Sequence, residues 1–310
     1  MKVLVTGCAG FIGYHLSKRL CIKSEKNIVF GIDNMNNYYD VQLKKSRLKD
    51  LKLNKNFNFK KINICNYNAL NKFISQNNIK FIIHLAAQAG VRHSIKYPQS
   101  YFKNNIYGFN NILEVSRINK VKHLLFASTS SVYGNSNKFP LKETDNTSNP
   151  LSFYAASKKS NEVCAFSYSN IYKIPITGLR FFTVYGPYGR PDMSLFKFVR
   201  NILNGKKIDL YNKGDHVRDF TYVEDVAKII FKITKKIPKK SEMFRIINIA
   251  SSEPVELKYF LEVIENITKL KFKINLLPMQ VGDVKKTHAD NRKLIKLIGK
   301  YKFTRIKKGI

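Results

Sequence analysis

Short hydrophobic segments alternate with longer amphipathic segments through the first 180 residues. The hydrophobic segments, such as KVLVTG and KFIIHLAA, are mostly continuous rather than alternating, which is typical of parallel strands buried on both faces. The longer segments, such as FIGYHLSKRLCI, carry apolar residues at helical spacing. Strands are expected at residues 2–7, 27–33, 57–63, 80–87, 122–129 and 173–181, and helices at 11–22, 41–51, 67–76, 98–118 and 151–172. The pattern predicts an α/β fold with a doubly wound parallel sheet covered by helices on both faces.

The pattern changes after about residue 181. The segment TVYGPYGRPDMS (183–194) is rich in Gly and Pro and is interpreted as a long functional loop. Beyond it the expected elements are helices near 194–204, 222–235, 255–266 and 290–298, and strands at 207–211, 244–250 and 271–276.

With 310 residues the chain has room for one large or two modest domains. We expect residues 1–180 to form the larger domain, together with segments near 214–250 where the chain returns to that domain. Residues 181–213 and 251–310 are expected to form an interleaved smaller α/β lobe. This lobe would close over the carboxyl edge of the sheet, where open α/β folds bind ligands.

The net charge of +34 raises the question of nucleic-acid binding. The lysines, however, are spread along every segment, often beside Asn and Ile, and they do not gather in one tail or stripe. No aromatic-basic RNA-binding signature or zinc finger is present. A general compositional preference for Lys, Asn and Ile explains the charge, and we expect no nucleic-acid partner.

The longest apolar runs, such as FIIHLAA, are far too short to cross a bilayer, so no membrane insertion is expected. The N-terminus begins directly with a strand and shows no basic segment followed by an apolar core, which favours a cytoplasmic location. The four cysteines, at positions 8, 21, 65 and 164, show no CxxC pair or metal-ligand spacing. They are interpreted as reduced thiols, and no metal site is expected.

Three glycines, Gly7, Gly10 and Gly13, lie between the first expected strand and the first expected helix. This could be a tight structural turn, or it could be a phosphate site in which missing side chains let the backbone approach a pyrophosphate at the helix N-terminus. Asp33, at the end of the second strand, can accept hydrogen bonds from a ribose and would repel a 2′-phosphate. The spacing is GxxGxxG rather than the commoner GxGxxG, but strand, helix and acid are all in place. We therefore expect a Rossmann-like site for NAD.

A second constellation follows the fifth expected strand, where FASTSSVYG ends in a row of hydroxyls and YAASK follows. Tyr154 and Lys158 are four residues apart and so share one helix face. A lysine ammonium and a cationic nicotinamide would both lower the pKa of the tyrosine, which could then act as a general base. YxxxK alone is common by chance, but after a glycine-rich turn it is the best catalytic candidate in the chain.

Several segments taken together resemble one known family: TGCAGFIG, HLAAQAGVRHS, STSSVYG, YAASK, LRFFTVYGPYGRPDM, VRDFTYVEDV and PMQVGDVKKTHAD. They are similar to the extended short-chain dehydrogenase/reductase family, and within it to NAD-dependent nucleotide-sugar epimerases acting on UDP-glucuronate. The resemblance runs from residue 1 to about residue 309.

The resemblance implies roles for individual residues. Tyr154 would be the base, Lys158 would hold the nicotinamide ribose, and Thr129 would help to bind the sugar hydroxyl. For the cofactor it further implies contacts from the three glycines, Asp33, Phe11, Ile12, Asn34, Asn63, Ile64, Leu85, Ala86, Ala87, Gln88 and Asn105. For the nucleotide it implies contacts from Arg92, Arg190, Tyr211, Arg218 and Gln280, with Arg218 on the diphosphate and Tyr211 near the uridine. Asn63 departs from the family, whose members usually carry an aspartate facing the adenine.

The implied reaction is epimerisation at C4 of a UDP-sugar through a 4-keto intermediate, and the segment after Thr129 bears on the outcome. Family dehydratases usually have TDEVYG there and UDP-glucuronate decarboxylases TSEVYG, whereas this chain has TSSVYG with Ser130 and Ser131. These hydroxyls, with Thr183, could instead hold a carboxylate by hydrogen bonds. We therefore predict conversion of UDP-glucuronate to UDP-galacturonate.

Other readings stay open at this point: epimerisation of UDP-glucose or a UDP-N-acetylhexosamine, decarboxylation, dehydration, or a non-catalytic NAD-binding sensor. The intact set of Thr129, Tyr154 and Lys158 argues against a sensor. By resemblance alone, a homodimer through the long helices at 98–118 and 152–172 is expected.

Overall fold

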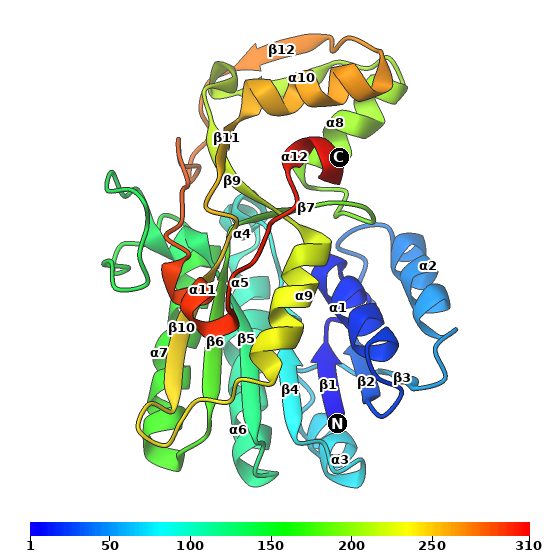
Figure 1. Cartoon of the computed structure of the whole chain (residues 1–310), viewed down its shortest axis with the longest axis vertical. Helices are drawn as coiled ribbons and strands as arrows, with labels where there is room; N and C mark the ends of the chain where they lie inside the picture. The colour runs from blue at the N-terminus through cyan, green and yellow to red at the C-terminus, as the bar shows by residue number, and fades with distance from the viewer.

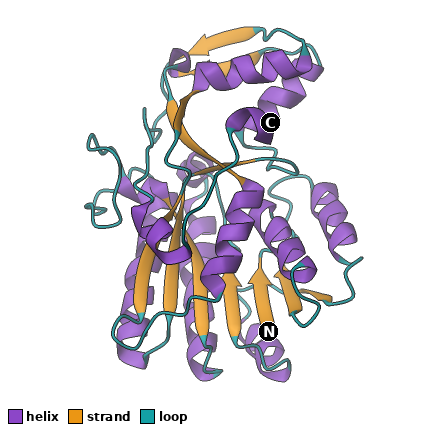
Figure 2. Ribbon diagram, in the orientation of Figure 1, coloured by secondary structure: helices purple, strands orange, loops and turns teal.

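The central feature of the structure is a seven-stranded, all-parallel sheet (Figures 1 and 2). The computed structural model describes residues 1–310. The strand order is β10-β6-β5-β4-β1-β2-β3. The chain therefore starts in the interior of the sheet and builds outward in both directions, so that the order reverses between β1 and β4. The strands are β1 (Lys2–Thr6), β2 (Ile28–Asp33), β3 (Phe57–Lys61), β4 (Phe81–His84), β5 (His123–Thr129), β6 (Ile176–Phe181) and β10 (Phe244–Ile249).

Helices cover both faces of this sheet, as expected for parallel strands that are hydrophobic along their length. One face packs against α1 (Phe11–Ile22), α2 (Val41–Leu51), α9 (Val223–Thr234) and α11 (Arg292–Ile298). The other packs against α3 (Tyr67–Gln76), α6 (Gly108–Ile118) and α7 (Phe153–Tyr172). Before α6 come α4 (Val91–Lys96), α5 (Pro98–Tyr101) and a π-helical turn at Phe102–Tyr107.

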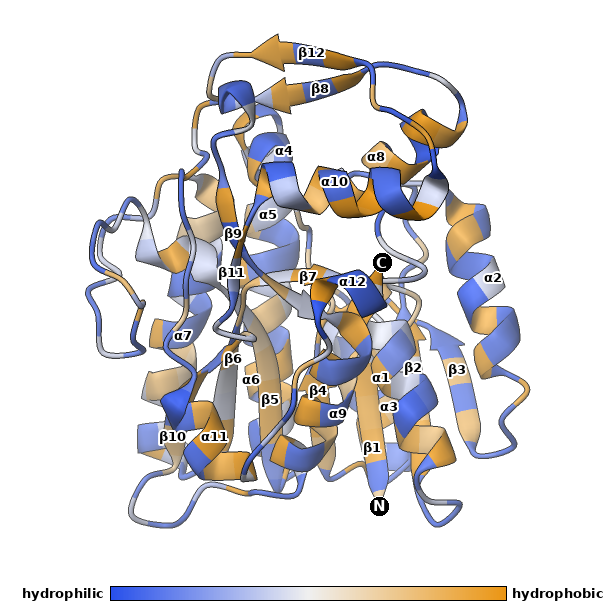
Figure 3. Ribbon diagram, turned by 45° about the horizontal axis from the view of Figure 1, so that its top comes forward, coloured by the Kyte–Doolittle hydropathy of each residue, from blue (hydrophilic) through white to orange (hydrophobic).

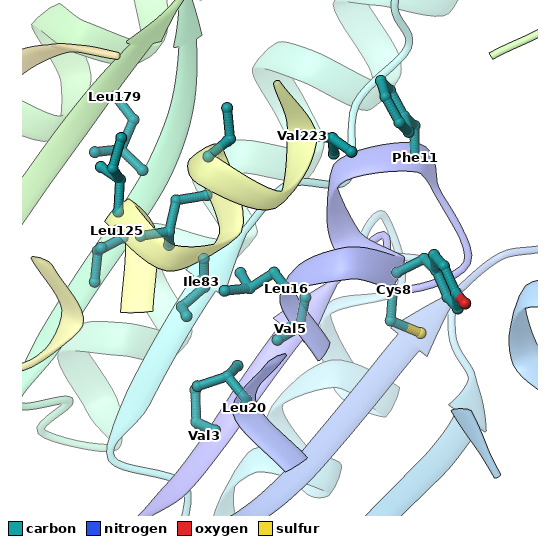
Figure 4. Close-up of a cluster of buried hydrophobic side chains, with 14 of the residues drawn as sticks. Val3, Val5, Cys8, Phe11, Leu16, Leu20, Ile83, Leu125, Leu179 and Val223 are labelled. Carbon is teal, nitrogen blue, oxygen red and sulfur yellow. The ribbon is translucent and has the colours of Figure 1, made fainter. Parts of the chain in front are cut away.

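The larger hydrophobic core lies between the sheet and helices α1 and α9 (Figure 4). Leu16 of α1 and Val223 of α9 are fully buried there with Ile83 and Leu125 of the strands. Because α9 is far along the chain yet packs beside α1, the C-terminal half of the protein is fixed to the N-terminal sheet.

A smaller lobe stands over the carboxyl ends of the strands (Figure 1). It contains α8 (Ser194–Leu203), β8 (Ile208–Tyr211), α10 (Leu257–Thr268) and β12 (Ile274–Leu277), with β8 and β12 paired in parallel. A three-stranded sheet of β7 (Thr183–Tyr185), β9 (Val217–Tyr222) and β11 (Pro254–Glu256) lies between this lobe and the large sheet. The chain ends in α12 (Ile306–Gly309).

The predicted doubly wound parallel sheet is confirmed, including all six strands expected before residue 182 and the later strand that becomes β10. Five α-helices and strands were not predicted: α4, β7, β9, β11 and α12. The segment 183–194, predicted as a loop, begins with the three-residue strand β7, which pairs with β9. A strand this short carries no periodicity of its own and forms only because a distant segment pairs with it.

The helices display both hydrophobic and hydrophilic residues along their surfaces (Figure 3). None of them combines the length and the apolar character that crossing a bilayer requires.

Candidate active site

The loop between β1 and α1 is shaped by its three glycines. Gly7 has a φ of +71°, and a Cβ there would lie 2.8 Å from the backbone nitrogen of Ala86. A Cβ at Gly13 would collide with the carbonyl oxygen of Gly7, so α1 can approach the loop only with glycine at this position. Gly10 is the N-cap of α1, and no side chain caps that helix or places a carboxylate in its first turn. The positive end of α1 is therefore free for an anion.

A cavity of about 440 Å³ opens at this loop, where the strand order reverses. It runs along the carboxyl ends of the strands, the place at which open α/β sheets bind ligands. Most of the predicted cofactor residues line it: Gly7, Gly10, Phe11, Ile12, Gly13, Asp33, Asn34, Ile64, Leu85, Ala86, Ala87, Gln88, Tyr154 and Lys158. The structure thus brings together residues that are up to 151 positions apart in the chain, Gly7 and Lys158.

Asp33 lies at the end of β2 and is 8% exposed. Its Oδ1 accepts a hydrogen bond from the backbone nitrogen of Met35 at 2.8 Å and lies 4.0 Å from Nζ of Lys44. Lys44 also lines the cavity and donates to the carbonyl of Asn36 at 2.9 Å. Burial lowers the pKa of Lys44, and the nearby Asp33 charge opposes that shift. Lys44 was not predicted as a site residue, because it is one of many lysines in a basic helix and no motif distinguishes it.

Two predicted cofactor residues, Asn63 and Asn105, do not line the cavity. The side chain of Asn63 accepts a hydrogen bond from the backbone nitrogen of Cys65 at 3.0 Å. Asn105 is 1% exposed; it accepts from the backbone nitrogen of Gln88 at 2.8 Å and donates to the Gln88 carbonyl at 3.0 Å. Asn105 also donates to Oγ of Ser157 on α7 at 3.0 Å, so it holds the Gln88 segment against α7.

The cavity fits a dinucleotide on features of this chain alone. The uncapped N-terminus of α1 suits a pyrophosphate, and Asp33 suits a ribose. Gln88 lines the cavity, and its buried Nε2 has no hydrogen-bond partner within the protein, which leaves a donor available to a bound group.

Tyr154 and Lys158 lie one turn apart near the start of α7, whose N-cap Ser152 accepts a hydrogen bond from the backbone nitrogen of Ala155 at 3.2 Å. They face the end of β5, where Oγ1 of Thr129 donates to Oγ of Ser131 at 3.2 Å. The three predicted catalytic residues therefore line the same cavity.

One predicted interaction within this group differs in the structure. Lys158 was expected to lower the pKa of Tyr154, but its Nζ donates to the carbonyl of Ala127 at 3.0 Å. Burial raises the pKa of Tyr154, and the opposing influences are the positive charge of Arg190 and the hydroxyl of Thr129. Burial also lowers the pKa of Lys158 to about 8. Arg190, rather than Lys158, is the cation that favours the phenolate in the structure.

A second cavity, of about 530 Å³, adjoins the first on the side of the smaller lobe. Both cavities are lined by Tyr38, Gly90, Val91, Thr183, Arg190 and Met193. Arg190 forms a bidentate ion pair with Asp192, with Nε–Oδ1 and Nη2–Oδ2 distances of 3.0 and 2.6 Å. The hydroxyl of Tyr38 also donates to Asp192, at 3.2 Å. Arg190 therefore stands, fixed by its partner, where the two cavities meet.

Basic side chains converge in the second cavity around Asp283. Nη2 of Arg218 lies 2.9 Å from Oδ1 of Asp283, and Nη2 of Arg92 lies 4.0 Å from Oδ2. Nε2 of His216 lies 3.7 Å from the same Oδ2. The Arg92 guanidinium also lies over the ring of Tyr211, 4.8 Å from its centroid. One carboxylate among these basic groups leaves positive charge to meet an anion such as a diphosphate.

The predicted substrate residues Arg92, Arg190, Tyr211 and Arg218 line this second cavity, and Ser130, Ser131 and Thr183 line the first. Gln280 lines neither of these cavities, and its Oε1 is buried without a partner. Asp283, Asp192, His216 and Tyr38 were not predicted. Asp283 and Tyr38 depend on contacts between segments far apart in the chain, for which a single sequence carries no signal. Asp192 and His216 are two residues from Arg190 and Arg218, but no motif distinguishes them.

Comparisons with known proteins agree with this geometry. A family model described as the NAD dependent epimerase/dehydratase family matches residues 3–250. The chain is 41% identical over 325 residues to a probable UDP-glucuronate 4-epimerase of Rhizobium meliloti (strain 1021), covering 100% of this chain and 95% of the relative. It is 41% identical over 304 residues to UDP-glucuronate 4-epimerase 1 of Arabidopsis thaliana, covering 94% of this chain and 70% of that protein.

Among solved structures, the fold superimposes on the UDP-glucuronic acid 4-epimerase from Bacillus cereus, crystallised with UDP-glucuronic acid and NAD. The TM-score is 0.93 at 34% sequence identity, with 100% of this chain and 96% of the other covered. The family suggested by the sequence motifs is thus confirmed by the match along the chain and by the fold. This chain belongs to the NAD-dependent epimerase/dehydratase family.

Proposed function

We propose that the protein interconverts UDP-glucuronate and UDP-galacturonate by NAD-dependent epimerisation at C4. The observation that carries this proposal is the composition of the cavity wall beside Tyr154. Ser130 and Ser131 line it with hydroxyls at the two positions where family dehydratases and decarboxylases carry one or two acids, and Thr183 adds a third hydroxyl from another segment. The relatives from Rhizobium meliloti and Bacillus cereus, both named for UDP-glucuronate or UDP-glucuronic acid 4-epimerisation, support the same substrate.

The first cavity would hold the cofactor and the catalytic group. The glycine loop and α1 would receive the pyrophosphate, Asp33 the ribose, and Lys158 the nicotinamide end. When bound, NAD supplies the hydride acceptor for C4 of the sugar, together with a positive charge beside the phenol.

Tyr154 would take the proton from the 4-hydroxyl of the sugar. Its buried phenol has a raised pKa, so deprotonation depends on nearby positive charge and on the hydroxyl of Thr129. Arg190, which lines both cavities, provides part of that charge. Lys158, whose ammonium is tied to the Ala127 carbonyl, would serve mainly to orient the bound ligand.

The second cavity would hold the nucleotide. Arg218 and Arg92 present guanidinium groups that suit a diphosphate, and the Tyr211 ring offers an apolar face for the uracil. Asp283 keeps both arginines in place while neutralising only part of their charge.

The sugar would then extend from the second cavity toward Tyr154, with its C5 carboxylate against Ser130, Ser131 and Thr183. Fixing this carboxylate matters because a 4-ketone makes it a β-keto acid, which loses CO2 readily. Neutral hydroxyl donors hold the carboxylate without adding an acid that could promote elimination.

We further propose that residues 1–180, with the returning segment near 214–250, form the cofactor domain, and that residues 181–213 and 251–310 form the nucleotide-sugar lobe. The return of α9 and β10 to the large sheet supports the first assignment. The second cavity nevertheless draws on both parts, since Arg92 and Arg218 come from outside the smaller lobe.

We also propose a homodimer through α7 and the helical segment that ends with α6. This face exposes large apolar side chains, including Val163 and Phe166 on α7, each 57% exposed, and Phe102 and Ile118 on the neighbouring segment. Large apolar side chains left exposed on neighbouring helices favour an association surface there. Sedimentation of the parent and of Val163→Glu should give a dimer and a monomer, respectively; a monomeric parent would contradict the proposal.

The function is tested by incubating the purified protein with NAD and, separately, UDP-glucuronate, UDP-glucose and UDP-N-acetylglucosamine, and resolving the products. We expect UDP-galacturonate from UDP-glucuronate, no UDP-pentose, and much slower turnover of the other two sugars. A UDP-pentose product would indicate decarboxylation, and preferential turnover of UDP-glucose would contradict the substrate assignment.

A further inference from the structure

Arg47, on α2, is one of the largest fully buried side chains in the protein, at 0% exposure, and it lines neither cavity. Its guanidinium forms no ion pair and bonds only to carbonyl and hydroxyl oxygens. Burying a cation without a carboxylate is costly, because dipoles replace only part of its hydration. An apolar side chain of similar length would fill the same space without that cost, so the charge and the shape of the guanidinium call for an explanation.

The guanidinium joins two loops that are distant in sequence. Nη1 donates to the carbonyl of Ala9 at 2.8 Å and to the hydroxyl of Tyr39 at 2.8 Å. Nη2 donates to the carbonyls of Tyr188 and Gly189, at 2.6 and 3.2 Å. The planar fork of the guanidinium reaches both sides with fixed geometry, whereas a lysine ammonium is a compact charge on a flexible chain.

The first of these loops is the glycine loop of the cofactor cavity. Ala9 stands between Gly7 and Gly10, and its carbonyl is held from outside the cavity by Arg47. The bond therefore restrains the backbone that we propose receives the pyrophosphate.

The second loop leads directly to Arg190. Tyr188 has a φ of +53°, which a residue with a side chain adopts only when its surroundings impose it. Arg47 holds the carbonyls of the two residues that precede Arg190, which lines both cavities and lowers the pKa of Tyr154 by its charge. The place of the Arg190 guanidinium thus depends on a loop conformation that Arg47 maintains.

Helix α1 also makes two contacts with the loop that leads to Arg190, but its side chains do not join that loop to the glycine loop. Nε2 of His15 lies 3.0 Å from the Pro187 carbonyl, and the ring of Tyr14 packs 5.2 Å from that of Tyr188, centroid to centroid. Both side chains come from the body of α1, several residues past the glycine loop. Arg47 alone bonds to the glycine loop and to the residues adjoining Arg190.

We propose that Arg47 is a positioning residue that couples the cofactor loop to the substrate loop. It sets Arg190 for the sugar nucleotide and fixes the glycine loop for NAD, so that binding of either ligand favours binding of the other. The role assigned to Arg190 rests on the proposed function, whereas the role toward the glycine loop does not depend on which sugar is bound.

A double-mutant cycle on Arg47 and Arg190 tests the first part. The dissociation constant of UDP-glucuronate is measured calorimetrically on NAD-loaded parent, Arg47→Met, Arg190→Met and the double variant. We expect Arg190→Met to weaken binding about tenfold or more and Arg47→Met about fivefold, with the double variant within about twofold of Arg190→Met, because residues that act as a unit are not additive. If the fold losses in UDP-glucuronate affinity of the two single variants multiplied in the double variant, Arg47 would not act through Arg190.

The second part is tested by titrating NAD into cofactor-free protein with no sugar nucleotide present. In the parent, UDP-glucuronate should raise NAD affinity. Arg47→Met should weaken NAD binding about fivefold or more and should abolish this effect of UDP-glucuronate. Lys49→Met, an exposed lysine on the same helix, is the matched control and should leave both affinities unchanged. Unchanged NAD affinity in Arg47→Met would overturn the coupling.

Two other outcomes can be distinguished from failure of the coupling proposal. If thermal unfolding shows that Arg47→Met does not fold, Arg47→Lys is used in its place. This variant keeps the positive charge but loses the forked guanidinium, so it should show the same losses of NAD and UDP-glucuronate affinity and the same non-additivity with Arg190→Met. If the parent binds NAD but not UDP-glucuronate, the substrate assignment fails, and the NAD titration still decides the role of Arg47.

Discussion

The two cavities meet at Arg190, yet they are built in different ways. The cofactor cavity is formed largely by backbone, with a loop whose shape depends on Gly7 and Gly13 and an uncapped helix N-terminus. The sugar-nucleotide cavity is formed by charged side chains from distant segments, such as Arg92, Arg218 and Asp283. A backbone site tolerates little change in shape, while a side-chain site can change its ligand by a few substitutions. This difference explains how one fold can keep its cofactor while its members differ in substrate.

The largest expected effect is a loss of turnover on substitution of Tyr154, the proposed general base. Tyr154→Phe removes the phenolic oxygen but keeps the buried ring, so the protein should fold and bind NAD as the parent does. Turnover should fall about a hundredfold to ten-thousandfold, the usual contribution of a general base. Steady-state kinetics with UDP-glucuronate measure this, and turnover within a few-fold of the parent would show that another group takes the proton.

A change in the cofactor loop should weaken NAD binding far more than binding of UDP to the NAD-free protein. In Gly13→Ala the new methyl group meets the Gly7 carbonyl, so α1 or the loop must shift. Overpacking of this kind costs about 1–3 kcal/mol, and NAD affinity should therefore fall about tenfold to a hundredfold. The affinity for UDP should stay within about twofold.

Gly205→Asn is a suitable control for this experiment. Gly205 also has a positive φ, but a Cβ there meets nothing within 4 Å, and asparagine tolerates this conformation. Equal losses of NAD and UDP binding in Gly13→Ala would mean that the two cavities are not separable.

A change at the sugar end should discriminate between substrates. Thr183→Val keeps the shape of the side chain but removes a donor beside Tyr154. A lost hydrogen bond to a charged group costs roughly 1.5–3 kcal/mol, so kcat/KM for UDP-glucuronate should fall about tenfold to a hundredfold. Any turnover of UDP-glucose, which has no carboxylate, should change much less. Equal losses for both sugars would argue against Thr183 as a carboxylate ligand.

The smallest expected effect is a change with pH in the free energy of unfolding, caused by the protonation of Lys158. Burial lowers the pKa of Lys158 from 10.5 to about 8, so between these pH values the unfolded chain binds more protons than the folded protein. The contribution of Lys158 to stability is therefore complete above about pH 10.5 and is lost as the pH falls through about 8.

Denaturant unfolding of the cofactor-free parent and of Lys158→Met, from about pH 7 to 10, measures this contribution. The free energy of unfolding of the parent, relative to the variant, should rise with pH across this range. A difference that does not change with pH would mean that Lys158 keeps its ordinary pKa in the folded protein.

The sequence predicted the cofactor cavity better than the sugar-nucleotide cavity, for a physical reason. The glycine loop, Asp33 and the Tyr154–Lys158 pair are local patterns, because a strand, a turn and a helix place nearby residues in a known way. Lys44 was missed although it is equally close in sequence, since one lysine in a basic helix has no distinguishing pattern.

In the sugar-nucleotide cavity the family resemblance supplied Arg92 and Arg218, but not the carboxylate that orients them. Asp283 reaches Arg218 because the segment before α11 lies along β9, a contact across 65 residues. The geometry around Lys158 also depends on a contact that the sequence does not show. Helical spacing placed the two residues on one face, but the Ala127 carbonyl on β5 determines where the ammonium points.

Transfer of hydride from C4 and its return to the same carbon is tested with UDP-glucuronate deuterated at C4. The products formed by the NAD-loaded protein in ordinary water are resolved and their deuterium content is measured by mass spectrometry and NMR. If the hydride returns to C4 as proposed, UDP-galacturonate should retain deuterium at C4, with no solvent hydrogen bonded to a sugar carbon. Loss of the C4 label to solvent, or exchange at C5, would contradict it.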